Sequence, residues 1–386
     1  MLPYGKQTIV QDDIDSVLEV LQSQWLTTGP AVEQFENALA DYTQAQGAVA
    51  VNSGTAALHT AMQAVGIGPG DEVVVPAITF VATANAAVYL GAKPVFADVD
   101  PDTLLIDPID VARKVSPRTK AIVGMDYAGQ PCDYRELKKL ADLNQSWLIA
   151  DGCHSLGGSY LQQKVGTLAD LTCFSFHPVK PITCGEGGAV VTDHEDLIPR
   201  MKSFRSHGIT SDFRQREKSS QHQYEMRSLG FNYRITDLQC ALGISQLSKL
   251  DRFTKRRNDI ARYYDQLFQT QKTITPLTTH PSVCHARHLY VVNWNRKLAG
   301  TDRNFAFAQL RDRGIGVNVH YQPVYQHPWY IAQFGDQTGC CPVAEKVYQD
   351  ILSLPIFPQM TEADIRFVVN TIFEIAELRV QLENAA

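Results

Sequence analysis

Short apolar runs alternate with longer mixed stretches over residues 30–260 of this 386-residue chain. Apolar runs of three or four residues that are bounded by turn-forming residues predict buried strands, and helical spacing of Ala, Leu and Met predicts the helices between them. The predicted strands are Ala48–Val51, Glu72–Val75, Pro94–Ala97, Ala121–Val123, Trp147–Ala150, Leu171–Phe174 and Ala189–Thr192, and the predicted helices are Thr55–Val65 and Thr83–Leu90. This alternation predicts an α/β fold with a large domain around a central, mainly parallel sheet that is covered on both faces.

The pattern changes near residue 250. The expected elements beyond that point are a single long helix over Leu242–Tyr264, an apolar run at His288–Trp294, a helix over Arg303–Arg313, a further run at Ile315–His320 and a last helix from Glu362 to about Leu382. Fewer strands and longer helices indicate a smaller α+β domain. We therefore expect a large domain over residues 1–250 and a small C-terminal domain over residues 251–386.

Composition narrows the class of protein. Hydrophobic residues make up 44% of the chain and charged residues 20%, which is typical of a globular protein. The net charge of −6 argues against a nucleic-acid partner. The N-terminus lacks the apolar core of a signal peptide, and no apolar stretch is long enough for a membrane span. Eight cysteines without a Cys-x-x-Cys pair favour reduced thiols in a cytoplasmic protein without a metal site.

The first candidate site lies between a predicted strand and a predicted helix, at Asn52–Thr55. Ser53 is a good helix N-cap, and the free N–H groups and positive dipole end of a helix bind phosphate. No Lys or Arg occurs from Gln7 to Ala92, so an anion held here would depend on amides and hydroxyls. The alternative is a simple helix cap.

The second candidate is Asp151, which follows the predicted strand Trp147–Ala150. Ligands of open α/β sheets bind at the carboxyl ends of the strands. A buried carboxylate is costly unless it faces a cation, and a protonated pyridine nitrogen would be such a cation. Asp151 could instead cap a helix or bind a metal, and His154 could support it through a hydrogen bond.

The third candidate is Lys180, which stands between two prolines after an apolar run and before a Gly-Glu-Gly-Gly turn. A restrained, partly desolvated lysine has a lowered pKa and can act as an amine nucleophile. The Ser175 hydroxyl could reach the same phosphate, and His177 could be a supporting group. Lys180 alone could be a solvated surface lysine. An anion site, a strand-end aspartate and a lysine in this order describe a pyridoxal 5′-phosphate site.

These residues resemble those of the DegT/DnrJ/EryC1/StrS family of sugar aminotransferases, over essentially the whole chain. The shared motifs are Ser53-Gly-Thr55, Pro76-x-x-Thr-Phe80, Asp151-x-x-His154, Ser175-Phe-His-x-x-Lys180 before Gly-Glu-Gly-Gly, and Gly230-Phe-Asn-Tyr-Arg234 with Asp237-Leu-Gln239. The resemblance implies the aspartate-aminotransferase (type I) fold of pyridoxal-phosphate-dependent transferases.

The resemblance also implies residue roles. The residues expected to hold the cofactor phosphate are Ser53, Gly54, Thr55 and Ser175, and His154 is a further expected cofactor-binding residue. Phe80 would stack on the ring, Asp151 would pair with its nitrogen, and Lys180 would bond its aldehyde. Asn232 would reach the phosphate of a neighbouring subunit, which makes a homodimer with shared active sites. Phe80 could instead be a core residue and Asn232 a turn residue.

The identity of residue 180 implies the reaction, because related 3-dehydratases carry His where this chain has Lys. Lysine implies amino transfer from L-glutamate to a keto sugar nucleotide, with pyridoxamine phosphate formed midway. The stretches around Asp126 and over His177–Gly188 are similar to PseC-type enzymes of pseudaminic acid synthesis. Those enzymes aminate UDP-2-acetamido-2,6-dideoxy-β-L-arabino-hex-4-ulose at C4. Many other family members carry His where Asp126 stands.

Charge favours a sugar nucleotide as well. Residues 200–234 contain eight Lys or Arg residues and three Asp or Glu residues. The candidates for holding a diphosphate are Arg205, Arg214, Arg216, Lys218, Arg227 and Arg234. A solvated loop is the alternative. His320 and Tyr321 resemble the sugar-contacting segment of the family, with a strand leading into a turn as the alternative, and His177 is a further substrate candidate.

Two other functions stay open from the sequence. One is amino transfer to a different keto sugar nucleotide, of the GDP-perosamine or dTDP-amino sugar type. The other is an inactive or regulatory protein with this fold. An inactive partner is expected to lack Lys180 or Asp151, and both are present.

Overall fold

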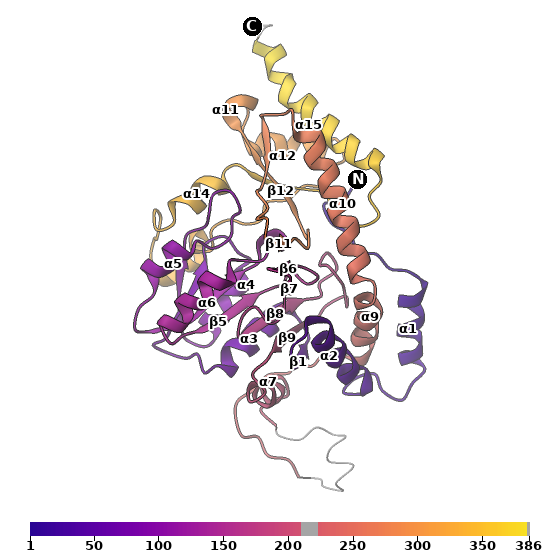
Figure 1. Cartoon of the computed structure of the whole chain (residues 1–386), viewed down its shortest axis with the longest axis vertical. Coiled ribbons are helices and arrows are strands. Elements are labelled where there is room, and N and C mark those ends of the chain that lie inside the picture. The colour runs from indigo at the N-terminus through magenta and orange to yellow at the C-terminus, as the bar shows by residue number, and fades with distance from the viewer. Residues whose placement is uncertain (210–222, 384–386) are drawn as a thin grey trace.

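The computed structural model describes residues 1–209 and 223–383. Helices pack around a central sheet, and a smaller sheet with its own helices stands at one end of it (Figure 1). Part of the basic segment over residues 200–234 lies outside the described residues. None of the described helices is long and apolar enough to cross a membrane.

The central sheet contains seven strands in the order β1-β9-β8-β5-β4-β2-β3. Its strands are β1 (Gly47–Val51), β2 (Glu72–Pro76), β3 (Lys93–Ala97), β4 (Thr119–Met125), β5 (Trp147–Asp151), β8 (Leu171–Ser175) and β9 (Gly188–Thr192). Only β9 runs antiparallel to its neighbours, and the other adjacent pairs are parallel. The predicted α/β fold with a mainly parallel sheet is confirmed, and each predicted strand matches one of these within two residues.

Helices cover this sheet, because its strands are apolar on both faces and therefore need cover on each side. The helices of this part are α1 (Gln11–Leu21), α2 (Pro30–Thr43), α3 (Gly54–Ala64), α4 (Val81–Tyr89), α5 (Pro108–Lys114), α6 (Tyr134–Leu143), α7 (Leu197–Arg205) and α9 (Asp237–Leu247), with a 3-10 turn η1 (Tyr127–Gly129). A small sheet of β6 (Ser159–Tyr160), β7 (Gln163–Lys164) and β11 (Val283–Cys284) lies beside it.

The C-terminal part is built on a three-stranded sheet in the order β10-β12-β13. Its elements are α10 (Leu250–Phe268), β10 (Ile274–Pro276), β12 (Tyr290–Trp294), α11 (Arg296–Ala299), α12 (Arg303–Asp312), η2 (Val324–Gln326), α13 (Pro328–Phe334), α14 (Pro342–Tyr348), β13 (Ile351–Leu354) and α15 (Glu362–Glu383). Helices α10, α12 and α15 pack around this sheet (Figure 1). The domain boundary near residue 250 stays a prediction.

The expected single helix over Leu242–Tyr264 is wrong, because the chain turns between α9 and α10. Lys249 lies at this turn and is only 8% exposed. Its ammonium donates to Asp13 Oδ1 at 2.9 Å and to the Ser245 carbonyl at 2.8 Å. A buried ammonium is stable only when it is paired, so Asp13 on α1 fixes the junction where the two helices meet.

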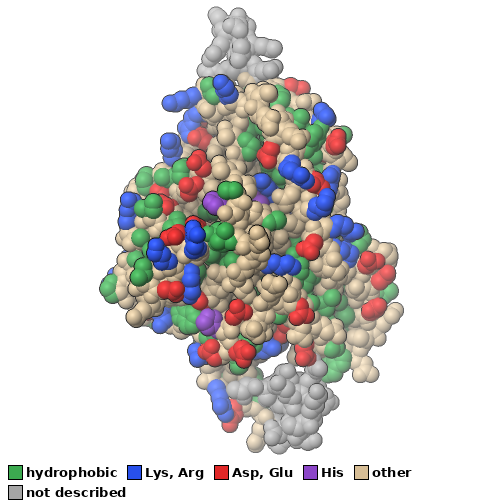
Figure 2. All heavy atoms as spheres, viewed as in Figure 1, with side chains coloured by type: hydrophobic (Ala, Val, Ile, Leu, Met, Phe, Trp, Pro, Cys, Tyr) green, Lys and Arg blue, Asp and Glu red, His purple; other side chains and the backbone are tan. Residues whose placement is uncertain are grey.

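The run Ile315–His320 does not form a sheet strand. It makes isolated pairings instead, from Ile315 to Leu2 and from Asn318 to Ser353. The N-terminal segment therefore occupies a place beside the C-terminal part that no local sequence pattern indicates. Acidic and basic side chains are interspersed over the face shown in Figure 2, in keeping with the modest net charge.

Candidate active site

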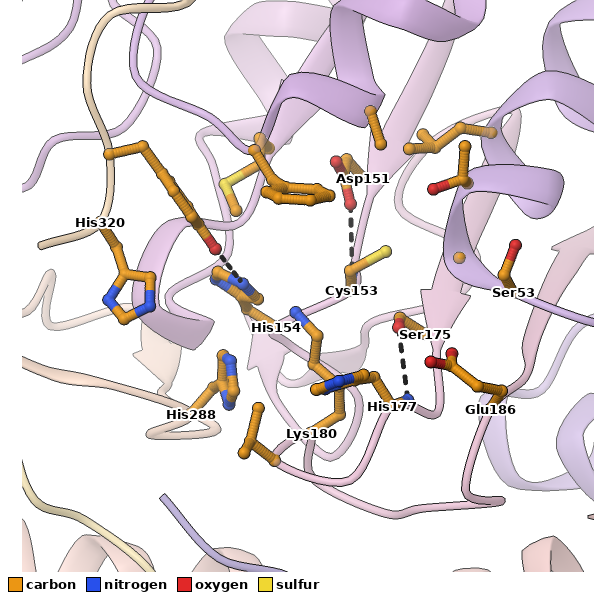
Figure 3. Close-up of a pocket in the computed structure, with 18 of the residues that line it drawn as sticks. Ser53, Asp151, Cys153, His154, Ser175, His177, Lys180, Glu186, His288 and His320 are labelled. Atoms are coloured by element: carbon orange, nitrogen blue, oxygen red, sulfur yellow. Dashed lines mark hydrogen bonds between the residues drawn. The ribbon is translucent and has the colours of Figure 1, made fainter. Parts of the chain in front are cut away.

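A cavity of about 920 Å³ opens at the carboxyl ends of β1, β5 and β8. Its walls bring together most of the predicted site residues. Those that line it are Ser53, Gly54, Thr55, Phe80, Asp151, His154, Ser175, His177, Lys180, His320 and Tyr321. The close-up in Figure 3 shows Lys180 extending into the space between Asp151 and the histidines. Residues far apart in the sequence thus converge on one site.

The start of α3 forms an anion cup, which we define as Ser53, Gly54, Thr55 and Ser175. Ser53 is the N-cap of α3, and its hydroxyl accepts a hydrogen bond from Ala56 N at 3.1 Å. A Cβ on Gly54 would lie 2.7 Å from Ser175 Cβ, so only glycine allows this close approach. Lys180 is the only Lys or Arg among the described residues that line the cavity. The cup therefore fits a phosphate bound by amides and hydroxyls.

Asp151 ends β5 and is only 3% exposed. Thr83 Oγ1 donates to Asp151 Oδ2 at 2.6 Å, and Cys153 N donates to Oδ1 at 3.2 Å. Both donors are neutral, so neither supplies a positive charge to the carboxylate. A cationic ring nitrogen in the cavity would complete this site. Among residues 1–209 and 223–383, no group of three His, Cys, Asp or Glu side chains is arranged to hold a metal ion.

His154 is 1% exposed, and its contacts differ from the expected support of Asp151. Its Nε2 lies 3.2 Å from the Tyr321 hydroxyl, while its Nδ1 is buried without a partner in the described part of the chain. Desolvation, followed by the charges of Lys180 and His320, holds the pKa of His154 well below its usual value. The imidazole is therefore neutral at physiological pH.

Lys180 lies in the turn between β8 and β9, and its N–H donates to the His177 carbonyl at 2.9 Å. Desolvation lowers the pKa of the Lys180 ammonium, and the charges of Cys153 and Asp151 oppose that shift. The side chain keeps some accessible surface because it borders the cavity, so the contents of the cavity set the extent of the shift. A neutral fraction of this amine is what a nucleophile requires.

Phe80 is not a core residue. Its side chain is 53% exposed, lines the cavity and lies with its ring centroid 5.9 Å from that of Tyr321. His320 is buried, and its Nδ1 lies 2.8 Å from Ser353 Oγ. Desolvation and then the charge of Lys180 lower the pKa of His320 to about 3.

Of the predicted diphosphate ligands, Arg205, Arg227 and Arg234 do not line the cavity of this chain, and neither does Asn232. Asn232 is exposed, and its carbonyl accepts from Asn52 Nδ2 at 3.3 Å. Arg227 pairs with Glu225 at 3.0 Å, and Arg205 donates to Glu36 and to the Ala50 carbonyl. Arg234 is half-buried outside the cavity. Arg214, Arg216 and Lys218 lie outside the described residues.

Asp126 does not line the cavity either, although its neighbour Met125 does. The Asp126 side chain is completely buried. The Asp126 side chain is therefore not placed to contact a ligand in the cavity.

Several cavity residues carry no pattern that sequence reasoning could use. They are Tyr4, Met125, Cys153, His288, Asn318 and Val319. Glu186 and Gln239 also line the cavity, and both belong to motifs that the sequence shares with the family. His288 is 4% exposed, and its ring centroid lies 4.3 Å from that of His154. In the sequence, His288 begins the apolar run His288–Trp294, so the pattern predicts a strand there. Strand β12 begins only at Tyr290. Leu289 N instead donates to the Ala128 carbonyl at 3.1 Å, which holds His288 ahead of the strand.

Residues 7–373 match the model of the DegT/DnrJ/EryC1/StrS aminotransferase family. The chain belongs to this family. The aminotransferase fold of type I and the transaminase class expected from the sequence are thereby confirmed.

Individual relatives agree with this membership. The chain is 40% identical to the spore coat polysaccharide biosynthesis protein SpsC of Bacillus subtilis (strain 168), over 97% of each chain. Among solved structures it is similar to Helicobacter pylori PseC, an aminotransferase involved in the biosynthesis of pseudaminic acid. That pair shares 34% identity and a TM-score of 0.91 over 97% of this chain and 99% of the other.

The putative sugar aminotransferase Spr1654 of Streptococcus pneumoniae is also similar. Its PMP-form has a TM-score of 0.91 at 29% identity, over 98% of this chain and 99% of that chain. The same protein has also been solved in a PLP-form. The expectation of pyridoxal phosphate as the cofactor is confirmed at the level of the family.

Proposed function

We propose that this sugar aminotransferase moves an amino group from L-glutamate to C4 of a UDP-linked 4-keto-6-deoxy-N-acetylhexosamine. The specific sugar would be UDP-2-acetamido-2,6-dideoxy-β-L-arabino-hex-4-ulose, and the pathway would be pseudaminic acid biosynthesis. The main observation behind the proposal is that Lys180, Asp151 and the anion cup share one cavity.

The chain's own groups divide the work in this proposal. Pyridoxal phosphate supplies an aldehyde and an electron-withdrawing ring that stabilises negative charge at the neighbouring carbon. The anion cup would hold the phosphate, Asp151 would face the ring nitrogen, and Phe80 would lie against the ring. Each of these groups already lines the cavity.

Lys180 would handle the proton. Its lowered pKa increases the fraction of neutral amine, which can accept a proton from the α-carbon of the amino acid and pass it on. His154 and His320 would remain neutral beside it, since desolvation lowers the pKa of both. Lys180 would then be the main proton carrier on this side of the cavity.

Two relatives support a sugar substrate and differ on which one. The similarity to PseC supports a pseudaminic acid precursor. The higher identity to SpsC favours a second candidate, a different keto sugar nucleotide used in polysaccharide synthesis. Because Asp126 lies outside the cavity wall, the sugar has to be identified by direct assay.

We also infer an active homodimer in the cytoplasm. Asn232 is exposed and lies outside its own chain's cavity, which suits a contact with a neighbouring subunit. Large apolar side chains are exposed in two places, close to Asn232 in the sequence and on α1. A partner subunit would cover them. They are Ile14, Leu18, Leu21, Met226, Leu229 and Phe231.

The decisive experiment is a panel assay. The purified protein is loaded with pyridoxal phosphate and incubated with L-glutamate and UDP-, GDP- or dTDP-linked 4-keto sugars, and the products are examined for a new amine. We expect amination of the UDP-linked N-acetyl sugar. Amination of GDP- or dTDP-sugars alone would refute the PseC-type proposal and keep the second candidate. Failure to bind the cofactor or to aminate any sugar would indicate an inactive or regulatory protein.

A further inference from the structure

Asp126 combines complete burial with a dense set of hydrogen bonds next to the cavity. Its Oδ1 accepts from Cys132 N at 2.9 Å and from the Tyr134 hydroxyl at 2.7 Å. Its Oδ2 accepts from Ser155 Oγ at 2.5 Å. No part of its side chain reaches the cavity. A buried carboxylate is costly, so this arrangement calls for a role beyond packing.

The main chain links Asp126 to Asp151 directly. Strands β4 and β5 are parallel neighbours, and Met125 pairs with Asp151 in their register. Asp126 N also donates to the Asp151 carbonyl at 3.1 Å. The same residue therefore contacts the end of β5 through its backbone and the following turn through its side chain.

The turn over residues 151–155 carries the two cavity groups that follow β5. Ser155 N donates to the Gly152 carbonyl at 2.9 Å, which closes the turn. Within it, Cys153 N donates to Asp151 Oδ1 at 3.2 Å. His154 leaves the same turn toward the Tyr321 hydroxyl. Figure 3 shows Asp151, Cys153 and His154 together at the cavity.

We propose that Asp126 is a positioning residue that fixes the 151–155 turn through Ser155, and thereby orients Asp151 and His154 toward the cavity. An amide in place of the carboxylate offers one acceptor oxygen to the three donors, so the Ser155 hydroxyl keeps only its longer contact of 3.3 Å with the Gly152 carbonyl, and the turn can then rotate. The Cys153 N–H and the imidazole of His154 move with it. This inference rests on the proposed role of Asp151 toward the ring nitrogen.

The role also accounts for the identity of residue 126 without a sugar contact. A different residue at this position would have to bind Ser155 in another way. It would therefore change the cavity indirectly, through the position of the 151–155 turn. Desolvation raises the pKa of Asp126 to about 7, while the bonds from Ser155, Tyr134 and Cys132 oppose that shift. The hydrogen bonds therefore hold a carboxyl group that burial disfavours in its charged form.

The test compares Asp126→Asn, Ser155→Ala and a control, Asp98→Asn, in the full-length protein. Asp98 is also a buried carboxylate with backbone donors, Val343 N at 2.9 Å and Ala344 N at 2.8 Å, but it lies outside the cavity wall. Each variant is titrated with pyridoxal phosphate to obtain the Kd, and the absorbance spectrum of the bound cofactor and the Tm are recorded.

We expect Asp126→Asn and Ser155→Ala to raise the cofactor Kd on the order of tenfold and to shift the absorbance, by analogy with residues that orient metal ligands. Asp98→Asn should lower the Tm with an unchanged Kd and spectrum. If Ser155→Ala and a folded Asp126→Asn bind the cofactor like the unmodified protein, the positioning role is wrong. If Asp126→Asn does not fold, Ser155→Ala decides alone. Failure of the unmodified protein to bind pyridoxal phosphate would instead overturn the proposed function.

Discussion

The two walls of the cavity are built in different ways. One wall, which we call the sheet wall, comes from the carboxyl ends of β1, β5 and β8 and carries the anion cup, Asp151 and Lys180. The other, the C-terminal wall, comes from irregular segments and carries His288, Asn318, His320 and Tyr321. The sheet wall presents charged groups and close backbone approaches. The C-terminal wall presents neutral rings and the Asn318 amide, so we propose that the sheet wall holds the cofactor and that the C-terminal wall recognises the substrate.

The largest expected effect is on the sheet wall, in Lys180→Ala. Among the described residues that line the cavity, Lys180 has the only amine, so its loss should lower turnover at least about 1,000-fold. The visible absorbance that depends on Lys180 should also disappear from cofactor-loaded protein. Steady-state rates and spectra are the measurements. A variant outside the cavity wall, Lys164→Ala, should leave both unchanged. Normal turnover in Lys180→Ala would mean that the sheet wall does not supply the proton-carrying amine, contrary to the proposal.

Gly54→Ala tests the close approach within the anion cup. The added Cβ would lie 2.7 Å from Ser175 Cβ, a contact that requires a shift. Overpacking typically costs about 1–3 kcal/mol, which corresponds to a cofactor Kd about 5- to 150-fold higher where the cost falls on the bound state. The Kd is measured by titration of the apoprotein with pyridoxal phosphate.

Gly68→Ala is the matched control for this prediction, because a Cβ there would meet nothing within 4 Å. Its cofactor Kd should equal that of the unmodified protein. Equal Kd values for both alanine variants would show that the cup does not hold the phosphate.

The two walls also differ in how far the sequence predicts them. The sheet wall was predictable because its groups follow apolar runs, and strand ends of a parallel sheet meet at one edge. The same logic failed for His288, which precedes an apolar run and is held by a bond between Leu289 and Ala128. Tyr4 and Asn318 reach the cavity through contacts between distant segments, and a local pattern carries no information on such contacts.

His288→Phe tests the C-terminal wall. The buried His288 imidazole accepts and donates no hydrogen bond to the described residues, and its Nδ1 is enclosed. Removing an unpartnered polar group should leave the Tm of the substrate-free protein unchanged or raised. If a substrate forms a hydrogen bond with the His288 imidazole, the KM for that substrate should be roughly 2- to 10-fold higher in His288→Phe, while the cofactor Kd stays constant.

His285→Phe is the control for the His288 variant, since both residues are buried on the same segment. His285 Nδ1 accepts from Arg287 N at 2.9 Å, and His285 does not line the cavity. Its replacement should lower the Tm without raising the KM. A lower Tm with an unchanged KM in His288→Phe would assign His288 to structure and remove it from the recognition wall.

The smallest expected effect on the cavity comes from the pH dependence of stability at Asp126, which lies next to the sheet wall. Desolvation raises the pKa of Asp126 to about 7 from its ordinary value near 3.8. Between these values the folded protein keeps a proton on Asp126 that the unfolded chain has released. The contribution of Asp126 to the free energy of unfolding therefore falls as pH rises from about 4 to about 7. Asp126→Asn cannot titrate, so the Tm of its apoprotein should change less with pH over this range, measured at constant ionic strength.

Parallel pH profiles for the two proteins would mean that hydrogen bonds from Ser155, Tyr134 and Cys132 outweigh burial and keep Asp126 ionised. In that case an ionised Asp126 carboxylate would fix the 151–155 turn through Ser155. The effect of Asp126→Asn on cofactor binding should then be correspondingly larger.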